Sequence, residues 1–186
     1  MNSDIEQILI TESELQAKIK ELGSRIAEDY KDKIPVLIGV LNGAVMFVSD
    51  LIRACPIQLN IDFMAVSSYQ DSTESSGVVK IIKDLDRNIS GRHILIVEDI
   101  IDTGLTLSYL LETLQARHPA SIKVCALLDK ASRRRVNVPI DYLGFQIPDK
   151  FVVGYGLDFR DLYRNLPYIG VLKPYLYEGI TGDNDI

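Results

Sequence analysis

The stretch from Val97 to Leu107 carries the residue types best suited to chemistry. It places two adjacent acids, Glu98 and Asp99, between an apolar run and a segment rich in threonine and glycine. Successive side chains of a strand point to opposite sides, so two neighbouring acids at a strand end diverge. Such a pair is able to bind two groups of one ligand, or the water shell of a Mg²⁺ ion.

The residues that follow the acids predict a phosphate site. The segment leads directly into a predicted helix, whose first amides have no partner within the helix and whose dipole favours an anion. Glycine at its centre lets the backbone approach the ligand closely, and two threonines add hydroxyl donors. These residues are Asp102, Thr103, Gly104, Leu105 and Thr106. The alternative is that Asp102 or Thr103 only caps the helix while the two acids are solvated.

Apolar runs elsewhere in the chain predict the elements that position this segment. Residues 36–41 are apolar without alternation, which is typical of a strand covered on both faces of a parallel sheet, and further strands are predicted over 94–97 and 122–128. Helices are predicted over 44–52, and after Thr106, where leucines recur at helical spacing. The order of strands and helices predicts an α/β fold with a mostly parallel sheet. In such sheets ligands bind beyond the carboxyl ends of the strands.

The amino-terminal part of the chain predicts one more helix. Thr11 and Glu14 have the spacing of a capping box, in which each residue's side chain bonds the other's backbone amide. Apolar residues follow at helical intervals: Leu15, Ile19, Leu22 and Ile26. We therefore expect an amphipathic helix that begins at Thr11.

Length and composition predict a single folded domain over residues 1–186. Hydrophobic residues make up 47% of the chain and charged residues 25%, as in ordinary globular proteins. The net charge of −6 argues against binding to nucleic acid. Neither a basic leader followed by an apolar core nor a membrane-spanning apolar run occurs, so a cytoplasmic protein without membrane contact is expected. Cys55 and Cys125 lack metal-site spacing and are expected to be buried hydrophobes.

A polar loop interrupts the predicted strands at residues 67–77. Five of its eleven residues are serine, and it lies between the strand-like segments 59–66 and 78–82. Long polar loops inside a compact domain are either functional lids or disordered, and its composition does not choose between them.

Residues 97–107 resemble the phosphoribosyl pyrophosphate (PRPP) motif of type I phosphoribosyltransferases. The resemblance implies a parallel-sheet core over about 30–150 and a small hood subdomain from the amino-terminal segment and about 151–180. It implies that Glu98 and Asp99 hold the ribose hydroxyls and Mg²⁺, and that the loop 102–106 holds the 5′-phosphate. Asp102 is implied to be the base that accepts a proton at purine N7.

Other segments resemble the hypoxanthine-guanine branch of that family, and the likeness extends over about 34–171. Leu41, Asn42 and Gly43 match its first pyrophosphate loop, with a cis Leu41–Asn42 peptide bond. Some members have lysine in place of Asn42, so this loop is expected to work through backbone amides. Arg164 matches a second pyrophosphate contact. Ser68 and Tyr69 match a mobile lid, which favours the lid interpretation of residues 67–77.

The purine site is implied by the same branch. Lys130 matches the residue that contacts the 6-oxo group, and Phe151 the one that stacks on the base. Val152 and Ile100 are expected to border the purine, and Asp158 to contact its far edge and a second Mg²⁺. From residue type alone, Lys130 also fits a solvated basic run over 130–135. Likewise Phe151 is more typical of a core, and Asp158 of a surface turn.

The implied reaction is transfer of the phosphoribosyl group from PRPP to hypoxanthine or guanine, with release of pyrophosphate. Relatives are dimers or tetramers, so a homo-oligomer is expected. A PRPP-sensing regulator without turnover is the main alternative, and the retained Asp102, Lys130 and Arg164 argue against it. A receiver-type signalling domain and a dinucleotide-binding enzyme fit less well, because Asp102 opens a phosphate loop and no GxGxxG follows a strand.

Overall fold

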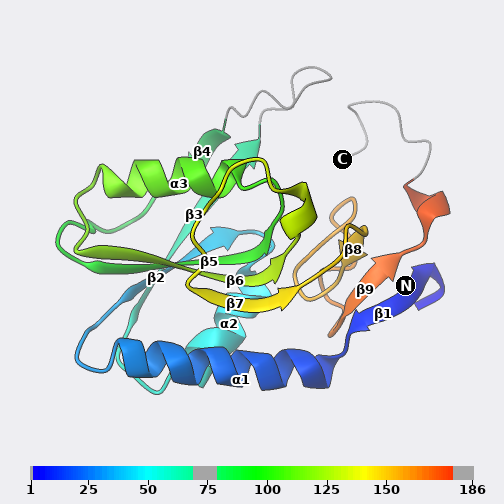
Figure 1. The fold of residues 1–186 in the computed structure, drawn as a ribbon, viewed down its shortest axis with the longest axis horizontal. Coiled ribbons are helices and arrows are strands. Elements are labelled where there is room, and N and C mark those ends of the chain that lie inside the picture. Colours follow the sequence, from blue (N-terminus) through cyan, green and yellow to red (C-terminus); the bar gives the residue numbers. More distant parts are fainter. Residues whose placement is uncertain (1, 69–78, 178–186) are drawn as a thin grey trace.

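A six-stranded sheet forms the centre of the molecule in this computed structural model, which describes residues 2–68 and 79–177 (Figure 1). The strand order is β4-β3-β2-β5-β6-β7, and every neighbouring pair is parallel except β3 and β4. The strands are β2 (Val36–Leu41), β3 (Asn60–Ser68), β4 (Val79–Lys83), β5 (His93–Ile101), β6 (Ser121–Asp129) and β7 (Tyr142–Gln146). The predicted α/β fold with a mostly parallel sheet is therefore confirmed.

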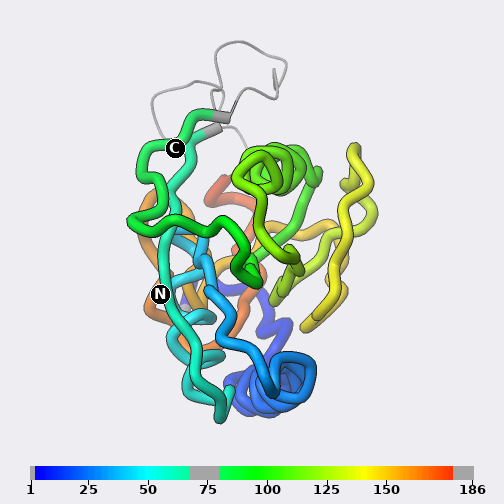
Figure 2. Tube along the Cα trace, turned by 90° about the vertical axis from the view of Figure 1, so that its left-hand side faces the viewer, coloured from blue at the N-terminus to red at the C-terminus, as the bar shows by residue number. Residues whose placement is uncertain are grey.

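Helices cover both faces of this sheet. α1 (Glu12–Asp29) and α2 (Val45–Ala54) lie on one face and α3 (Leu105–Gln115) on the other, as Figures 1 and 2 show. Three short 3-10 helices complete the described elements: η1 (Asn2–Asp4), η2 (Ala131–Arg133) and η3 (Pro174–Leu176). The layered arrangement brings the loops after β2, β5 and β6 to one edge of the sheet, as expected for parallel strands.

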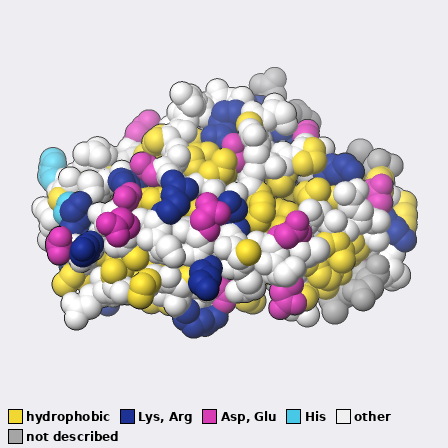
Figure 3. All heavy atoms as spheres, turned by 60° about the horizontal axis from the view of Figure 1, so that its bottom comes forward, with side chains coloured by type: hydrophobic (Ala, Val, Ile, Leu, Met, Phe, Trp, Pro, Cys, Tyr) yellow, Lys and Arg dark blue, Asp and Glu magenta, His cyan; other side chains and the backbone are white. Residues whose placement is uncertain are grey.

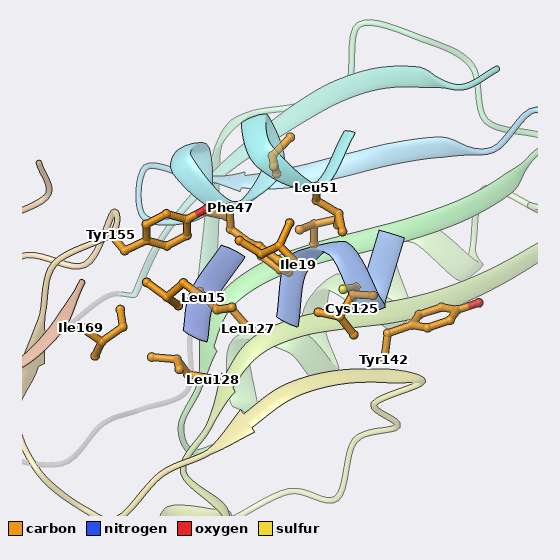
Figure 4. Packing of buried hydrophobic residues seen from close by; sticks show 14 of the residues in the cluster. Leu15, Ile19, Phe47, Leu51, Cys125, Leu127, Leu128, Tyr142, Tyr155 and Ile169 are labelled. Carbon is orange, nitrogen blue, oxygen red and sulfur yellow. The ribbon is translucent and has the colours of Figure 1, made fainter. Parts of the chain in front are cut away.

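The capping box at the start of α1 is confirmed. The Thr11 amide donates to Glu14 Oε2 (2.8 Å), and the Glu14 amide donates to Thr11 Oγ1 (3.3 Å). The four predicted apolar residues of α1 are all buried. Figure 4 shows Leu15 and Ile19 of this set beside Phe47 and Leu51 of α2. Each such side chain removed from water stabilises the fold by about 1.5–3 kcal/mol.

Both cysteines are buried and unpaired, as predicted. Cys125 packs in the core between the sheet and α1 (Figure 4). Burial raises the pKa of the Cys55 thiol to about 11, and it also raises the pKa of Cys125. Both thiols are therefore protonated at neutral pH and behave as small apolar groups.

A second, three-stranded antiparallel sheet joins segments from near the two ends of the chain. Its order is β1 (Ile5–Ile10), β9 (Ile169–Leu172) and β8 (Val152–Val153). In Figure 1 it lies beside the edge of the main sheet where β2 ends, and Gly156 just after β8 approaches Gly43 just after β2. No local pattern had predicted these strands, because β8 has only two residues and β1 pairs with a segment about 160 positions away.

Several element boundaries differ from the predictions. α2 begins at Val45 rather than Ala44, and it ends at Ala54. β5 continues to Ile101 instead of ending at Val97. Ser67 and Ser68 belong to β3, where Ser67 pairs with Lys80 of β4, so the polar loop starts later than predicted. The rest of the predicted lid, including Tyr69, lies outside the described residues.

The face of the molecule on the α1 side shows acidic and basic side chains interspersed (Figure 3). This face therefore offers no broad positive surface for a polyanion. Among residues 2–68 and 79–177, no helix is long and apolar enough to cross a membrane.

Candidate active site

The two acids of the chemistry-bearing segment lie inside β5 rather than after it. The strand extends because its pairing with β6 continues through Glu98, Ile100 and Ile101, opposite Ala126, Leu128 and Asp129. The prediction that β5 ends at Val97 was wrong for this reason: the acids interrupt the apolar run without interrupting the ladder of backbone hydrogen bonds. The predicted divergence of the two acids still follows from the strand geometry.

Glu98 is buried, and Asp99 beside it is partly buried. Glu98 is only 6% exposed. Burial, with the neighbouring Asp99 charge, raises the pKa of Glu98, and burial also raises the pKa of Asp99 to about 6. Within the described chain no lysine or arginine forms an ion pair with Glu98. A bound cation, or hydrogen bonds from hydroxyl groups, would stabilise the charged form of such carboxylates.

Gly43 contacts Asp99, which brings together two segments separated by more than fifty residues. A Cβ atom at Gly43 would lie 1.7 Å from Asp99 Oδ2, so no larger residue fits there. Gly156 packs against Gly43: a Cβ atom on Gly156 would lie 2.0 Å from the Gly43 carbonyl oxygen. Its φ of 101° also favours glycine. The peptide bond between Leu41 and Asn42, just before Gly43, is cis, as the resemblance implied.

Arg164 lies against the same glycine corner. Its Nη1 donates to the Gly156 carbonyl oxygen (2.9 Å), and the Arg164 carbonyl accepts from the Gly156 amide (2.9 Å). Nη1 also lies 2.9 Å from Asp158 Oδ1, and Nη2 donates to Asp161 Oδ1 (3.0 Å). The structure therefore gathers Gly43, Asp99 and Arg164, although the Arg164 guanidinium is paired with two carboxylates.

The loop after β5 forms a cavity at the start of α3. The cavity has a volume of about 160 Å³ and is lined by Glu98, Ile100, Ile101, Asp102, Thr103, Gly104, Thr106 and Leu107. Gly104 is the N-cap residue of α3 in the left-handed conformation, with φ of 84°. Thr103 Oγ1 accepts a long hydrogen bond from the Leu105 amide, at 3.4 Å. The predicted phosphate loop therefore lines one hollow together with Glu98.

Asp102 does not cap α3. Its Oδ1 lies 3.1 Å from Arg133 Nε but, within the described residues, has no aligned hydrogen-bond donor. Arg133 also reaches Asp149, with Nη1 3.4 Å from Oδ1. The alternative in which Asp102 serves only as a helix cap is wrong, because its side chain faces the basic segment and not the α3 amides. A carboxylate oxygen without an aligned donor is able to accept a proton.

Lys130 is buried rather than solvated. Its side chain is only 11% exposed, and its Nζ lies 4.0 Å from Asp149 Oδ1. Burial lowers the pKa of the Lys130 ammonium. The interpretation of residues 130–135 as a solvated run is therefore wrong for Lys130. Sequence reasoning also missed Arg133 and Arg134, which contact the loop after β5. The only signal for them was a basic cluster directly after a predicted buried strand.

Phe151 and Val152 lie at the edge of the small sheet. Phe151 is 36% exposed, so its interpretation as a core residue is wrong. Its ring stacks on Tyr177, with centroids 4.9 Å apart and planes 21° apart, and meets Phe159 edge-on. Val152 is buried in β8 opposite Val171. An exposed aromatic ring supported from behind by other rings offers a surface for stacking.

The predicted metal ligands do not form a closed cage. Within the described residues, no three His, Cys, Asp or Glu side chains converge on one metal position. Both carboxylate oxygens of Asp158 have partners, Oδ1 with Arg164 Nη1 and Oδ2 with the Asp161 amide. Glu98 and Asp99 are therefore the better-placed oxygen donors. Mg²⁺ commonly uses one or two carboxylates and completes its shell with substrate oxygens and water.

Comparison with known proteins identifies the family. The model of the phosphoribosyl transferase domain matches residues 5–160. The chain belongs to the phosphoribosyltransferase family. It is 58% identical to the hypoxanthine-guanine phosphoribosyltransferase of Bacillus subtilis, with 96% of this chain and 99% of the relative covered. Identity to the Mycobacterium avium protein of the same name is 54%, over 94% of this chain and 89% of that protein.

Solved phosphoribosyltransferases share this architecture. A crystal structure of a hypoxanthine phosphoribosyltransferase from Staphylococcus aureus superposes with a TM-score of 0.92 at 51% identity, covering 95% of this chain and 96% of that one. The chain therefore has the type I phosphoribosyltransferase fold that its PRPP-like motif predicted.

Proposed function

We propose that this phosphoribosyltransferase transfers the 5-phosphoribosyl group of PRPP to hypoxanthine, guanine or both, forming IMP or GMP and releasing pyrophosphate, a reaction of purine salvage. One observation carries the proposal: three distant segments converge where β5 leads into the loop from Asp102, with Gly43 against Asp99 and Arg164 bonded to Gly156, which lies against Gly43. A ligand with a phosphate, a sugar diol and a second anionic group matches that arrangement. The choice of hypoxanthine and guanine as the acceptor bases follows the names of the relatives.

PRPP would lie across the edge of the sheet. The 5′-phosphate would bind the loop of Asp102, Thr103, Gly104, Leu105 and Thr106, where the first amides of α3 and two hydroxyls are available. The ribose hydroxyls would donate to Glu98 and Asp99, which accept few protein hydrogen bonds. The pyrophosphate would contact the amides of Asn42 and Gly43, and Arg164 would exchange Asp158 or Asp161 for pyrophosphate oxygens.

Mg²⁺ fits the oxygen donors of this site. We propose that Glu98 and Asp99 hold it and that Asp158 serves a second ion when Arg164 releases it. The raised pKa values of Glu98 and Asp99 support this assignment, because removal from water raises both values and, for Asp99, outweighs the opposing effect of the Arg164 charge. When bound, Mg²⁺ supplies positive charge that stabilises the departing pyrophosphate.

The purine would lie between the loop after β6 and the small sheet. The Lys130 ammonium would donate to the 6-oxo group, and it discriminates against adenine because an ammonium has no lone pair to accept from an amino group. The Phe151 ring would stack on the base, with Ile100 and Val152 at its edges. Asp102, whose Oδ1 has no aligned donor among the residues that the structure describes, would take the proton from purine N7 as the glycosidic bond forms.

The remaining assignments follow the family. We propose that Ser68 and Tyr69 belong to a lid over PRPP, that the sheet of β1, β9 and β8 is the hood over a core of about 30–150, and that the protein works in the cytoplasm as a dimer or tetramer. A PRPP-binding regulator without turnover is the competing function.

A single assay separates these functions. The purified protein is incubated with PRPP, MgCl₂ and one base at a time, and nucleotide and pyrophosphate are quantified. We expect equimolar nucleotide and pyrophosphate with hypoxanthine or guanine, and little product with adenine. Binding of PRPP without product would favour the regulator, and efficient use of adenine would contradict the role of Lys130.

A further inference from the structure

Arg134 joins the end of β6 to the phosphate loop through a single guanidinium. Its side chain is only 17% exposed. Nη2 donates to Oδ1 of Asp129, the last residue of β6, and Nε donates to the carbonyl oxygen of Asp102 (3.2 Å). Asp129 itself is 6% exposed, so this ion pair is shielded from water. Charge-assisted bonds of this kind are stronger and more directional than neutral ones.

The backbone next to Arg134 holds the following carbonyl of the same loop. The amides of Arg135 and Val136 both donate to the Thr103 carbonyl oxygen, at 2.9 Å and 3.1 Å. The segment also lies directly against Gly104, where an added Cβ atom would be 2.6 Å from the Val136 carbonyl oxygen and 3.0 Å from Arg134 Cδ. Three donors therefore fix two successive carbonyls just before α3.

Fixing a carbonyl also fixes the amide on the other side of the same peptide plane. In a trans peptide the C=O and N–H bonds point in opposite directions, and the plane rotates as a unit. The carbonyls of Asp102 and Thr103 point toward the segment 130–136, so the amides of Thr103 and Gly104 point away from it. Amides held in that direction form an anion-binding loop before any ligand arrives.

We infer that Arg134 is a positioning residue for 5′-phosphate binding: anchored by Asp129, it orients the Asp102–Thr103 peptide so that its amide faces the phosphate. The inference rests on the proposed function, since it concerns the same phosphate loop. The segment also carries Lys130, whose amide donates to the Ile101 carbonyl (2.9 Å). One short segment thus fixes the phosphate loop and carries the proposed purine contact.

The test compares two ligands that differ only in the 5′-phosphate. Dissociation constants of IMP and inosine are measured by calorimetry, with inosine determined by competition against IMP, for the wild type, R134Q and R134K. The ratio of the inosine constant to the IMP constant isolates the contribution of the phosphate. We expect R134Q to lower this ratio at least about tenfold, equivalent to about 1.4 kcal/mol. R134K retains the charge beside Asp129 but lacks the planar fork, so we expect an intermediate ratio.

Controls distinguish positioning from general damage. R117Q removes an arginine that pairs with Asp84 (2.8 Å) beyond the far end of α3, and it should leave the ratio unchanged. Equal weakening of IMP and inosine by R134Q, or an unchanged ratio, would overturn the inference. If R134Q fails to fold, the ratio of the inosine constant to the IMP constant for R134K tests the inference instead. We expect this ratio to fall at least about threefold, and an unchanged ratio would overturn the inference.

Failure of the proposed function is recognised separately. Binding requires no turnover, so a wild type that binds IMP more tightly than inosine but forms no nucleotide would contradict the enzyme and not the role of Arg134. A wild type that forms nucleotide while R134Q retains the full phosphate contribution would contradict only the role of Arg134.

Discussion

At the amino-terminal end of the parallel sheet, the Asp29 carboxylate accepts two hydrogen bonds from side chains of the fold. Lys123 Nζ lies 2.8 Å from its Oδ2, and the Tyr142 hydroxyl donates to the same oxygen at 2.5 Å. These hydrogen bonds, with Lys123 the larger cause, lower the pKa of Asp29. At the carboxyl-terminal end, Glu98 is buried and Asp99 partly buried, and removal from water raises the pKa values of both.

The difference between the two ends identifies the functional one. Where carboxylates only support the fold, partners within the chain lower the cost of their charge. Where a ligand must be bound, the chain does not fully compensate the desolvation of the acids. An incoming cation or hydroxyl group therefore binds favourably to them. Matched substitutions at the two ends should therefore affect activity and stability in opposite ways.

The largest difference is expected for loss of basicity at Asp102. Asp102→Asn preserves size and shape but removes the proton acceptor, so kcat should fall about 10²- to 10⁴-fold. Steady-state rates with saturating PRPP and hypoxanthine measure the effect. Asp29→Asn makes the same chemical change at the other end and should leave kcat unchanged. An Asp102→Asn enzyme with full turnover would remove the base assignment.

A methyl group added beside the acids should have the next largest effect. In Gly43→Ala the new Cβ would clash with Asp99 Oδ2, at 1.7 Å in the present geometry. Displacing reacting groups by about 1 Å costs about 10²-fold, so kcat/KM should fall by that factor. Gly91→Ala is the matched control, because its Cβ meets nothing within 4 Å although its φ is 69°. It should cost about 1 kcal/mol of stability without changing kcat/KM.

Replacing a carboxylate by an amide should affect the free energy of unfolding differently at the two ends of the sheet. Asp29→Asn weakens a largely solvent-accessible pair and should lower the free energy of unfolding by about 0.5–1 kcal/mol. Glu98→Gln replaces a buried carboxyl group that forms no ion pair among residues 2–68 and 79–177, so stability should be unchanged or increased while activity falls. Urea unfolding at pH 7 without metal measures both. A destabilised Glu98→Gln variant would show that Glu98 supports the fold as Asp29 does.

The pH dependence of stability gives the smallest and most specific contrast. The pKa of Asp99 rises from 3.8 to about 6 on folding, so between these values the folded state binds the proton more tightly. Its contribution therefore makes stability fall as pH rises through that window. Asp29 has the opposite sign: its lowered pKa contributes stability above 3.8 that is lost as the pH falls through its folded value. Asp99→Asn should flatten the slope between pH 4 and 6 in metal-free urea titrations, whereas Asp29→Asn should leave that slope unchanged.

Local sequence patterns predicted the layers of the fold but not its second sheet. The capping box at Thr11 and the apolar run 36–41 were correct because each involves neighbours within a few positions. The predicted end of β5 was wrong because Glu98 and Asp99 interrupt the apolar run. The backbone of this stretch nevertheless continues to pair with β6. β1 and β9 could not be predicted as partners, because their pairing depends on contacts between opposite ends of the chain.

The candidate site divides in the same way. The sequence by itself determined the acids Glu98 and Asp99 and the phosphate loop after them, because adjacent residues on a strand and its following turn must stay together. Only the tertiary structure decided that Gly43 reaches Asp99, that Arg164 bonds Gly156 beside Gly43, and that Arg134 reaches the Asp102 carbonyl. Those contacts depend on the parallel register that aligns the ends of β2, β5 and β6. No short-range pattern encodes that register, because the burial of both sheet faces fixes it collectively.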